Sequence, residues 1–131
     1  MNPLDQFTDQ PYLNLESFRR DGTGMKTPVW FVQQGEILYV RTIADSGKVK
    51  RIRNISRINV SPCRVDGEPI GNWSAARVRE VQSTSTFEES INRLFEMKYG
   101  DTYRDMTRKS AEAGRKYTFL RLSLLDKRRL A

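Results

Sequence analysis

The chain has 131 residues, of which 37% are hydrophobic and 30% are charged, with 23 lysines and arginines against 16 acidic residues. This length predicts a single domain over residues 1–131, and the apolar content excludes intrinsic disorder. The sequence contains no histidine and a single cysteine, Cys63. Disulfide frameworks, zinc clusters and all sites that depend on imidazole are therefore excluded, and no metal site is expected.

The N-terminal segment, residues 1–18, contains no lysine, no arginine and no long apolar run, so no signal peptide is expected there. No stretch of the sequence approaches the 18 consecutive apolar residues that a membrane helix needs. We therefore expect a cytoplasmic protein without a membrane contact. A short helix is predicted to begin at Pro3, with Asn2 as its N-cap, and to end before Pro11.

Most of the remaining chain alternates between β-branched or aromatic runs and glycine-containing turns, a pattern typical of strands joined by hairpins. Helices are expected at three places. The first covers residues 48–54 with Ser46 as N-cap, the second opens at the capping box 85–88 and runs to Tyr99, and the third covers 102–113. Strands are predicted at 12–18, 26–33, 36–42, 57–63, 71–81 and 115–125. This order predicts a mainly β fold, a small closed or partly closed β-barrel with a few helices.

The highest density of positive charge falls on the strand–turn–helix unit from Leu38 to Asn54, LYVRTIADSGKVKRIRN. A helix N-terminus presents unpaired backbone N–H groups and a partial positive charge, which favours anions. Ser46 would add a hydroxyl, Gly47 would let a phosphate approach the backbone, and Lys48 would add a charge. The alternative is an ordinary helix whose solvent-facing side is basic.

Three runs, taken together, resemble the flavin and deazaflavin split-barrel oxidoreductases of the pyridoxamine 5'-phosphate oxidase-like superfamily. They are FRRDGTGMKTPVWFV (18–32), the unit 38–54, and INVSPCRVDGEPIGNW (58–73). The similarity is nearest to the branch that uses the deazaflavin coenzyme F-420. The resemblance implies an FMN-binding split β-barrel that forms a homodimer, with a cofactor in each of two clefts at the subunit interface.

The resemblance also assigns roles to individual residues. It implies that the backbone of Thr27, Pro28, Val29 and Trp30 faces the cofactor ring. It further implies that the cofactor phosphate is held by Arg41, Thr42, Ser46, Gly47, Lys48 and Lys50. No catalytic acid or base is expected from the protein, because the cofactor ring is itself the reactive group.

One departure from the superfamily concerns the closing strand. The vitamin oxidases have Arg-x-His there, whereas this chain has Arg121-Leu122-Ser123. Pyridoxine phosphate oxidation is therefore not expected, and the haem-handling relatives are disfavoured for the same reason. The sequence predicts an oxidoreductase that uses FMN or F-420 on a small organic substrate. The alternatives are a small basic β-barrel that binds nucleic acid and a flavin carrier without turnover.

Overall fold

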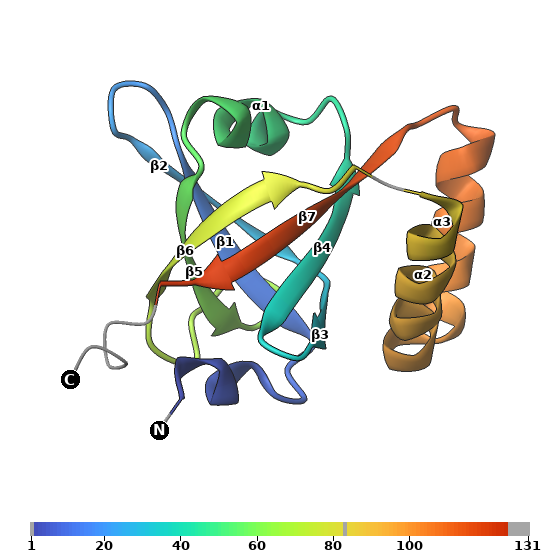
Figure 1. Cartoon of the computed structure of the whole chain (residues 1–131), viewed down its shortest axis with the longest axis horizontal. Coiled ribbons are helices and arrows are strands. Elements are labelled where there is room, and N and C mark those ends of the chain that lie inside the picture. Colours follow the sequence, from blue (N-terminus) through green and yellow to red (C-terminus); the bar gives the residue numbers. More distant parts are fainter. Residues whose placement is uncertain (1, 83, 126–131) are drawn as a thin grey trace.

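The computed structural model describes residues 2–82 and 84–125, which form one curled antiparallel sheet with helices outside it (Figure 1). The sheet has seven strands in the order β2-β1-β5-β6-β7-β4-β3. Their bounds are β1 (Tyr12–Phe18), β2 (Gly24–Val29), β3 (Phe31–Gln34), β4 (Ile37–Ile43), β5 (Arg57–Cys63), β6 (Ser74–Glu80) and β7 (Tyr117–Leu124). The expected mainly β, partly closed barrel is confirmed.

The helices also lie close to their predicted positions. They are a short 3-10 helix η1 (Pro3–Phe7) and three α-helices: α1 (Gly47–Asn54), α2 (Ser85–Tyr99) and α3 (Asp101–Glu112). The predicted caps of Asn2 and Ser46 are confirmed, since their side chains accept from the amides of Leu4 and Val49. None of the described helices is long and apolar enough to cross a membrane.

The predicted capping box at 85–88 is wrong by one residue. Thr84 is the N-cap of α2, and its hydroxyl accepts from the Phe87 amide at 3.2 Å. Thr84 and Phe87 are three residues apart, which is the spacing of an N-cap and its N3 residue. Ser85 and Glu88 have the same spacing one residue later, so the sequence alone fits either pair.

The predicted strand 26–33 is divided at Trp30, which is a second correction. Its first half pairs only with β1, from Phe18↔Gly24 to Leu13↔Val29, and its second half pairs only with β4. One continuous segment therefore supplies both edge strands of the sheet. At the break, the Phe31 amide donates to the Tyr99 hydroxyl at 3.0 Å, and that hydroxyl donates to the Pro11 carbonyl at 2.8 Å.

Two apolar clusters account for the packing. The barrel interior is filled by alternate residues of the strands, among them Leu13, Leu15, Val40 and Leu122, all fully buried. A second cluster lies outside the sheet, where α2 and α3 cover β3, β4 and part of β7; it includes Phe95, Tyr103 and Phe119. In Figure 1 this helical hairpin lies on one side of the barrel, and α1 lies at one end.

Candidate anion-binding site

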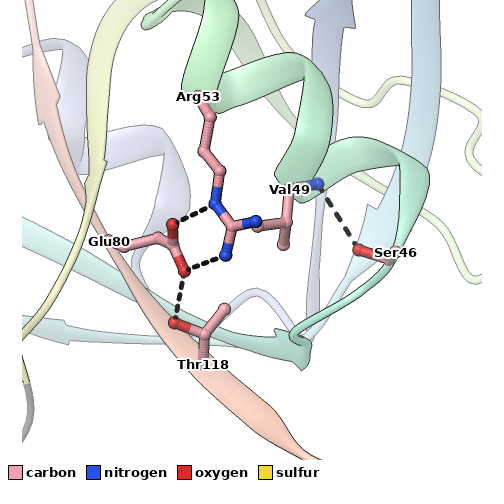
Figure 2. Close-up of polar contacts among 5 residues, drawn as sticks. All are labelled: Ser46, Val49, Arg53, Glu80 and Thr118. Atoms are coloured by element: carbon pink, nitrogen blue, oxygen red, sulfur yellow. Dashed lines mark hydrogen bonds and ion pairs between the residues drawn. The ribbon is translucent and has the colours of Figure 1, made fainter.

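The N-terminus of α1 follows directly from the end of β4. Ser46 caps the helix, its Oγ lying 3.4 Å from the Val49 amide (Figure 2). The amides of Gly47 and Lys48 stand in the first turn, where a helix has no internal acceptor for them. No acidic residue stands in this first turn. The local electrostatics therefore favour an anion at this helix end.

Lys48 places its charge at this helix end. Its Nζ donates to Thr42 Oγ1 at 2.9 Å, and Thr42 is only 7% exposed. Burial lowers the pKa of Lys48 below its ordinary value of 10.5, and the nearby charge of Arg51 lowers it further. Within residues 2–82 and 84–125, no carboxylate lies within 4.0 Å of this ammonium group. Lys48 is thus a partly desolvated cation whose one hydrogen-bond partner there is neutral.

Arg51 also lies at this site, although it was not among the predicted phosphate ligands. Its Nε donates at 2.7 Å to the hydroxyl of Ser17, a fully buried residue of β1. The guanidinium lies back along the helix, so that a Cβ built on Gly47 would stand 3.0 Å from Arg51 Nη1. The spacing of four residues between Gly47 and Arg51, one helical turn, was the available signal. Ser17 carried no signal, because its contact with Arg51 spans 34 residues.

Two of the predicted phosphate ligands lie elsewhere. Arg41 is next to Thr42 in β4, so its side chain is on the opposite face of the sheet. There its Cζ lies 3.2 Å from the centroid of the Tyr117 ring and 5.3 Å from that of Tyr103. Lys50 is exposed and lines a pocket of about 410 Å³ with Asp45 and Arg53, and none of Thr42, Ser46, Gly47 and Lys48 lines that pocket. The structure therefore joins Thr42, Ser46, Gly47 and Lys48, but not Arg41 or Lys50.

The segment predicted to face the cofactor ring forms an open edge of the sheet. Thr27, Pro28 and Val29 pair with β1 on one side and with no described strand on the other. Pro28 suits this position because it has no N–H to donate to a further strand. The β3–β4 ladder ends at Phe31↔Val40, so the last part of β4 pairs only with β7. Two unpaired backbone edges therefore flank the split in the barrel.

The Trp30 side chain is held at the break between β2 and β3. Its ring stacks on Tyr99, with the centroids 4.4 Å apart and an angle of 11° between the planes. Tyr103 lies 6.3 Å from the same indole and also contacts Arg41. Trp30 and Arg41 therefore both lie against Tyr103 of α3. In this arrangement the backbone of Trp30 is fixed by packing of its side chain against α2.

The other end of α1 is anchored by an ion pair. Arg53 Nε lies 2.6 Å from Glu80 Oε1, and Arg53 Nη2 lies 3.1 Å from Glu80 Oε2. The Thr118 hydroxyl donates to Glu80 Oε2 at 3.0 Å, so β6 and β7 both hold the helix (Figure 2). The hydrogen bond from Arg53 holds the pKa of Glu80 below its ordinary value.

The chemistry of the donor set at the α1 N-terminus fits a phosphate. Lys48 and Arg51 contribute two positive charges, and the amides of Gly47 and Lys48 are further donors. A phosphate group offers several strong acceptor oxygens and up to two negative charges, which match such a set. The residues can therefore hold the phosphate of a mononucleotide-like cofactor.

Neither a comparison with protein-family models nor one with curated proteins gives a match to this sequence. Solved structures do match. The haem storage protein HutZ from Vibrio cholerae has a TM-score of 0.70 at 12% identity, covering 93% of this chain and 87% of HutZ. A FAD-binding protein from Mesorhizobium loti has a TM-score of 0.63 at 14% identity, covering 96% and 90%. An F420 reductase has a TM-score of 0.54 at 16% identity, covering 96% of each chain.

These similarities establish the fold of the chain. The fold is a split β-barrel, as the sequence predicted, and it is shared with the structures of HutZ, of the FAD-binding protein and of the F420 reductase. HutZ shows that haem-handling proteins share this architecture as closely as those named for flavins. At these identities the shared architecture does not determine the ligand, which has to be argued from the residues of this chain.

Proposed function

We propose that this protein binds FMN or the deazaflavin F-420 and is an oxidoreductase acting on a small organic substrate. The observation that carries the proposal is Lys48, a partly desolvated cation that donates to the Thr42 hydroxyl at the N-terminus of α1. A lysine in such surroundings is costly unless an anion neutralises it. A cofactor phosphate at this place would supply that anion.

The comparisons support this class of ligand. One similar structure is described as FAD-binding and another as an F420 reductase. HutZ is described as a haem storage protein, but the present chain contains no histidine to ligate a haem iron. The lysine and arginine at α1 suit a phosphate better than a metal centre. We therefore favour the flavin and deazaflavin class over haem.

When bound, such a cofactor supplies the hydride chemistry, and the protein supplies position and surroundings. Lys48, Arg51 and the first amides of α1 would hold the phosphate. The open backbone edge of Thr27 to Val29 would lie along the ring and offer hydrogen bonds to its polar rim. Trp30, fixed against Tyr99, would keep that edge from shifting. The side chains of the described site offer no clear general acid or base, so none is assigned.

We further propose that the active form is a homodimer with the cofactor clefts at the subunit interface. The support comes from the family resemblance and from the open edges, which leave the ring side of the site bare within one chain. Sedimentation velocity on the purified protein tests this point. We expect a mass of twice 15.3 kDa, and a monomer that binds the cofactor with full affinity would contradict it.

The test of the proposed function is a spectroscopic titration. The purified protein is titrated with FMN and, separately, with F-420, following absorbance and fluorescence. We expect saturable binding of at least one coenzyme, with one molecule per chain. Binding of neither would contradict the proposal. If one coenzyme binds, its reoxidation by candidate acceptors under anaerobic conditions distinguishes an enzyme from a carrier.

A further inference from the structure

A further cavity lies at the end of the barrel opposite α1. Its volume of about 530 Å³ is within the range of about 300–1,000 Å³ that is typical of small-molecule sites. Three segments meet around it: the residues between η1 and β1, the first residues of β3, and the last turn of α2. In Figure 1, η1 and β3 lie at the lower end of the barrel, whereas α1 lies at the upper end. The cavity therefore shares no residue with the α1 site.

The Tyr99 hydroxyl holds these three segments together. It accepts from the Phe31 amide at 3.0 Å and donates to the Pro11 carbonyl at 2.8 Å. Asp9 turns the chain between η1 and β1 with a φ of 61°, in the left-handed region. Aspartate enters that region more readily than most residues, because its short polar side chain can hydrogen-bond locally. The shape of the cavity is therefore set by contacts within the chain itself.

The cavity combines apolar walls with two opposite charges. Its apolar walls include the side chains of Phe7, Pro11, Phe31 and Tyr99. Its charged residues are Asp9 and Lys98, which are both exposed and can be reached by a ligand. The two charges are not paired with each other, since within residues 2–82 and 84–125 neither makes an ion pair of 4.0 Å or less. A ligand that carries both charges could lie between them.

Lys98 has hydrogen-bonding capacity left for such a ligand. Its Nζ donates to the Phe31 carbonyl at 2.8 Å and lies 3.5 Å from the centroid of the Phe31 ring. An ammonium group has three N–H donors, and this carbonyl is its one acceptor among the described residues. Packing of the ammonium group partly desolvates it and lowers the pKa of Lys98 below its ordinary value of 10.5, whereas the charge of Asp9 acts in the opposite direction. A ligand carboxylate would supply the solvation that the charged lysine lacks.

We infer that this cavity binds a free amino acid with an apolar side chain. The ligand carboxylate pairs with Lys98, the ligand ammonium group pairs with Asp9, and the apolar side chain contacts the aromatic walls. Asp9 repels a carboxylic acid that lacks the amino group, and Lys98 repels an amine that lacks the carboxylate, so both charges of the ligand are needed. The site does not depend on the proposed cofactor.

Three probes of similar shape test this requirement. L-phenylalanine has both charges, 3-phenylpropionate has only the carboxylate, and 2-phenylethylamine has only the ammonium group. Isothermal titration of the unaltered protein should give saturable binding of one L-phenylalanine per chain. We expect each of the other two probes to bind at least tenfold more weakly. This comparison needs no variant, so it holds even where a substitution disturbs folding.

Two substitutions assign the charges to residues. Lys98→Met keeps the length of the side chain and removes its charge, and Asp9→Asn keeps a residue that tolerates the left-handed backbone. Each should weaken L-phenylalanine binding at least tenfold. Lys109→Met removes the same charge as Lys98→Met from an exposed position on α3, and it should change the affinity less than twofold. Thermal unfolding of each variant checks that it is folded.

Three results would overturn the inference. In the first, the unaltered protein shows no saturable binding of L-phenylalanine. In the second, Lys98→Met and Asp9→Asn bind L-phenylalanine as well as the unaltered protein does. In the third, 3-phenylpropionate or 2-phenylethylamine binds as tightly as L-phenylalanine, which would make the cavity a site for a single charge. Failure of FMN and F-420 to bind leaves these results unaffected, so the two proposals fail separately.

Discussion

The two ends of α1 carry positive charge in different ways. At the C-terminal end, Arg53 makes two contacts with the Glu80 carboxylate, and Thr118 holds the same carboxylate from β7. Toward the N-terminal end lie the side chains of Lys48 and of Arg51, whose guanidinium reaches back from the last turn toward Gly47. Their hydrogen bonds are as short, but the partners are the neutral hydroxyls of Thr42 and Ser17. A single helix of eight residues thus combines a completed ion pair with two cations that lack one among the described residues.

This difference separates a structural role from a binding role. The charge of a cation that is paired with a carboxylate is largely neutralised, so this cation attracts an anionic ligand only weakly. A partly buried cation beside hydroxyls is less stable in its charged form, as the lowered pKa of Lys48 shows. An incoming anion removes that cost. A substitution at the N-terminal end should therefore lower ligand affinity more than protein stability. A substitution at the C-terminal end should lower protein stability more than ligand affinity.

The largest expected effect is that of Lys48→Met on cofactor affinity. Loss of a charge-assisted hydrogen bond costs about 1.5–3 kcal/mol, so the dissociation constant should rise roughly ten- to a hundredfold. The affinity is measured by titration with whichever coenzyme binds the unaltered protein. Lys109→Met, an exposed position on α3, removes the same charge and is the matched control. Lys50→Met should also have little effect, and a loss equal to that of Lys48→Met would place Lys50 at the phosphate.

The pH dependence follows from the lowered pKa of Lys48. In the free protein, the folded state binds fewer protons at this group than the unfolded state as the pH approaches 10.5, so its contribution to stability rises with pH. The bound phosphate needs the charged form, so cofactor affinity should fall over the same alkaline range. Titrations from neutral to alkaline pH should show a steeper fall in the unaltered protein than in Lys48→Met. If affinity falls equally with pH in both proteins, deprotonation of Lys48 does not weaken cofactor binding.

Ser46→Ala should have a smaller effect, divided between stability and binding. The substitution removes the side-chain acceptor of the Val49 amide, and loss of an N-cap costs about 1 kcal/mol. The free energy of unfolding, measured by urea denaturation, should fall by this amount, and cofactor affinity should fall a few-fold. Ser46→Asp keeps the cap but adds a negative charge, so it should recover stability while binding the phosphate less well than Ser46→Ala.

Glu80→Gln tests the other end of the helix and should leave cofactor affinity unchanged. The hydrogen bond from Arg53 lowers the pKa of Glu80, so this carboxylate stabilises the folded state above about its ordinary pKa of 4.5. That contribution is lost as the pH falls through the lowered pKa. The variant should therefore be slightly less stable than the unaltered protein at neutral pH and equal to it in acid, as judged by thermal unfolding at both pH values. A substantial loss of cofactor affinity would remove the distinction between the two ends.

The smallest expected effect is a gain in stability from Arg121→Gln. It removes a like-charge pair with Arg79, and such cross-strand pairs are worth about 0.2–1 kcal/mol. The unfolding midpoint in denaturant should rise at low salt, and the difference should shrink as salt screens the repulsion. A fall in stability would show that Arg121 is already neutralised in the free protein.

Much of this structure could be predicted from local sequence. The helix after β4, the Ser46 cap and the strands other than the divided run 26–33 depend on alternation and spacing within short segments, and these were confirmed. The placement of the Arg41 and Thr42 side chains on opposite faces of the sheet could also have been predicted, because neighbouring residues of a strand face opposite sides. Similarly, Lys48 and Lys50 are two residues apart on a helix and do not share a face.

No local sequence pattern could have predicted the break at Trp30. The run 26–33 has the composition of one strand, yet the Phe31 amide is taken by the hydroxyl of Tyr99, 68 residues further along the chain. The contact between Arg51 and Ser17 likewise joins two distant elements. Side chains of this kind have no periodic signal, because their partners are chosen by packing.

The sequence by itself determined that this protein is a mainly β barrel, that it has no imidazole chemistry, and that its charge is concentrated beside a capped helix. Those properties follow from composition and short-range periodicity, which act before the chain folds. Only the tertiary structure decided which cations meet a carboxylate. Arg53 reaches Glu80, whereas Lys48 and Arg51 reach hydroxyls, because strand register and helix docking fix the distances between residues far apart in the chain.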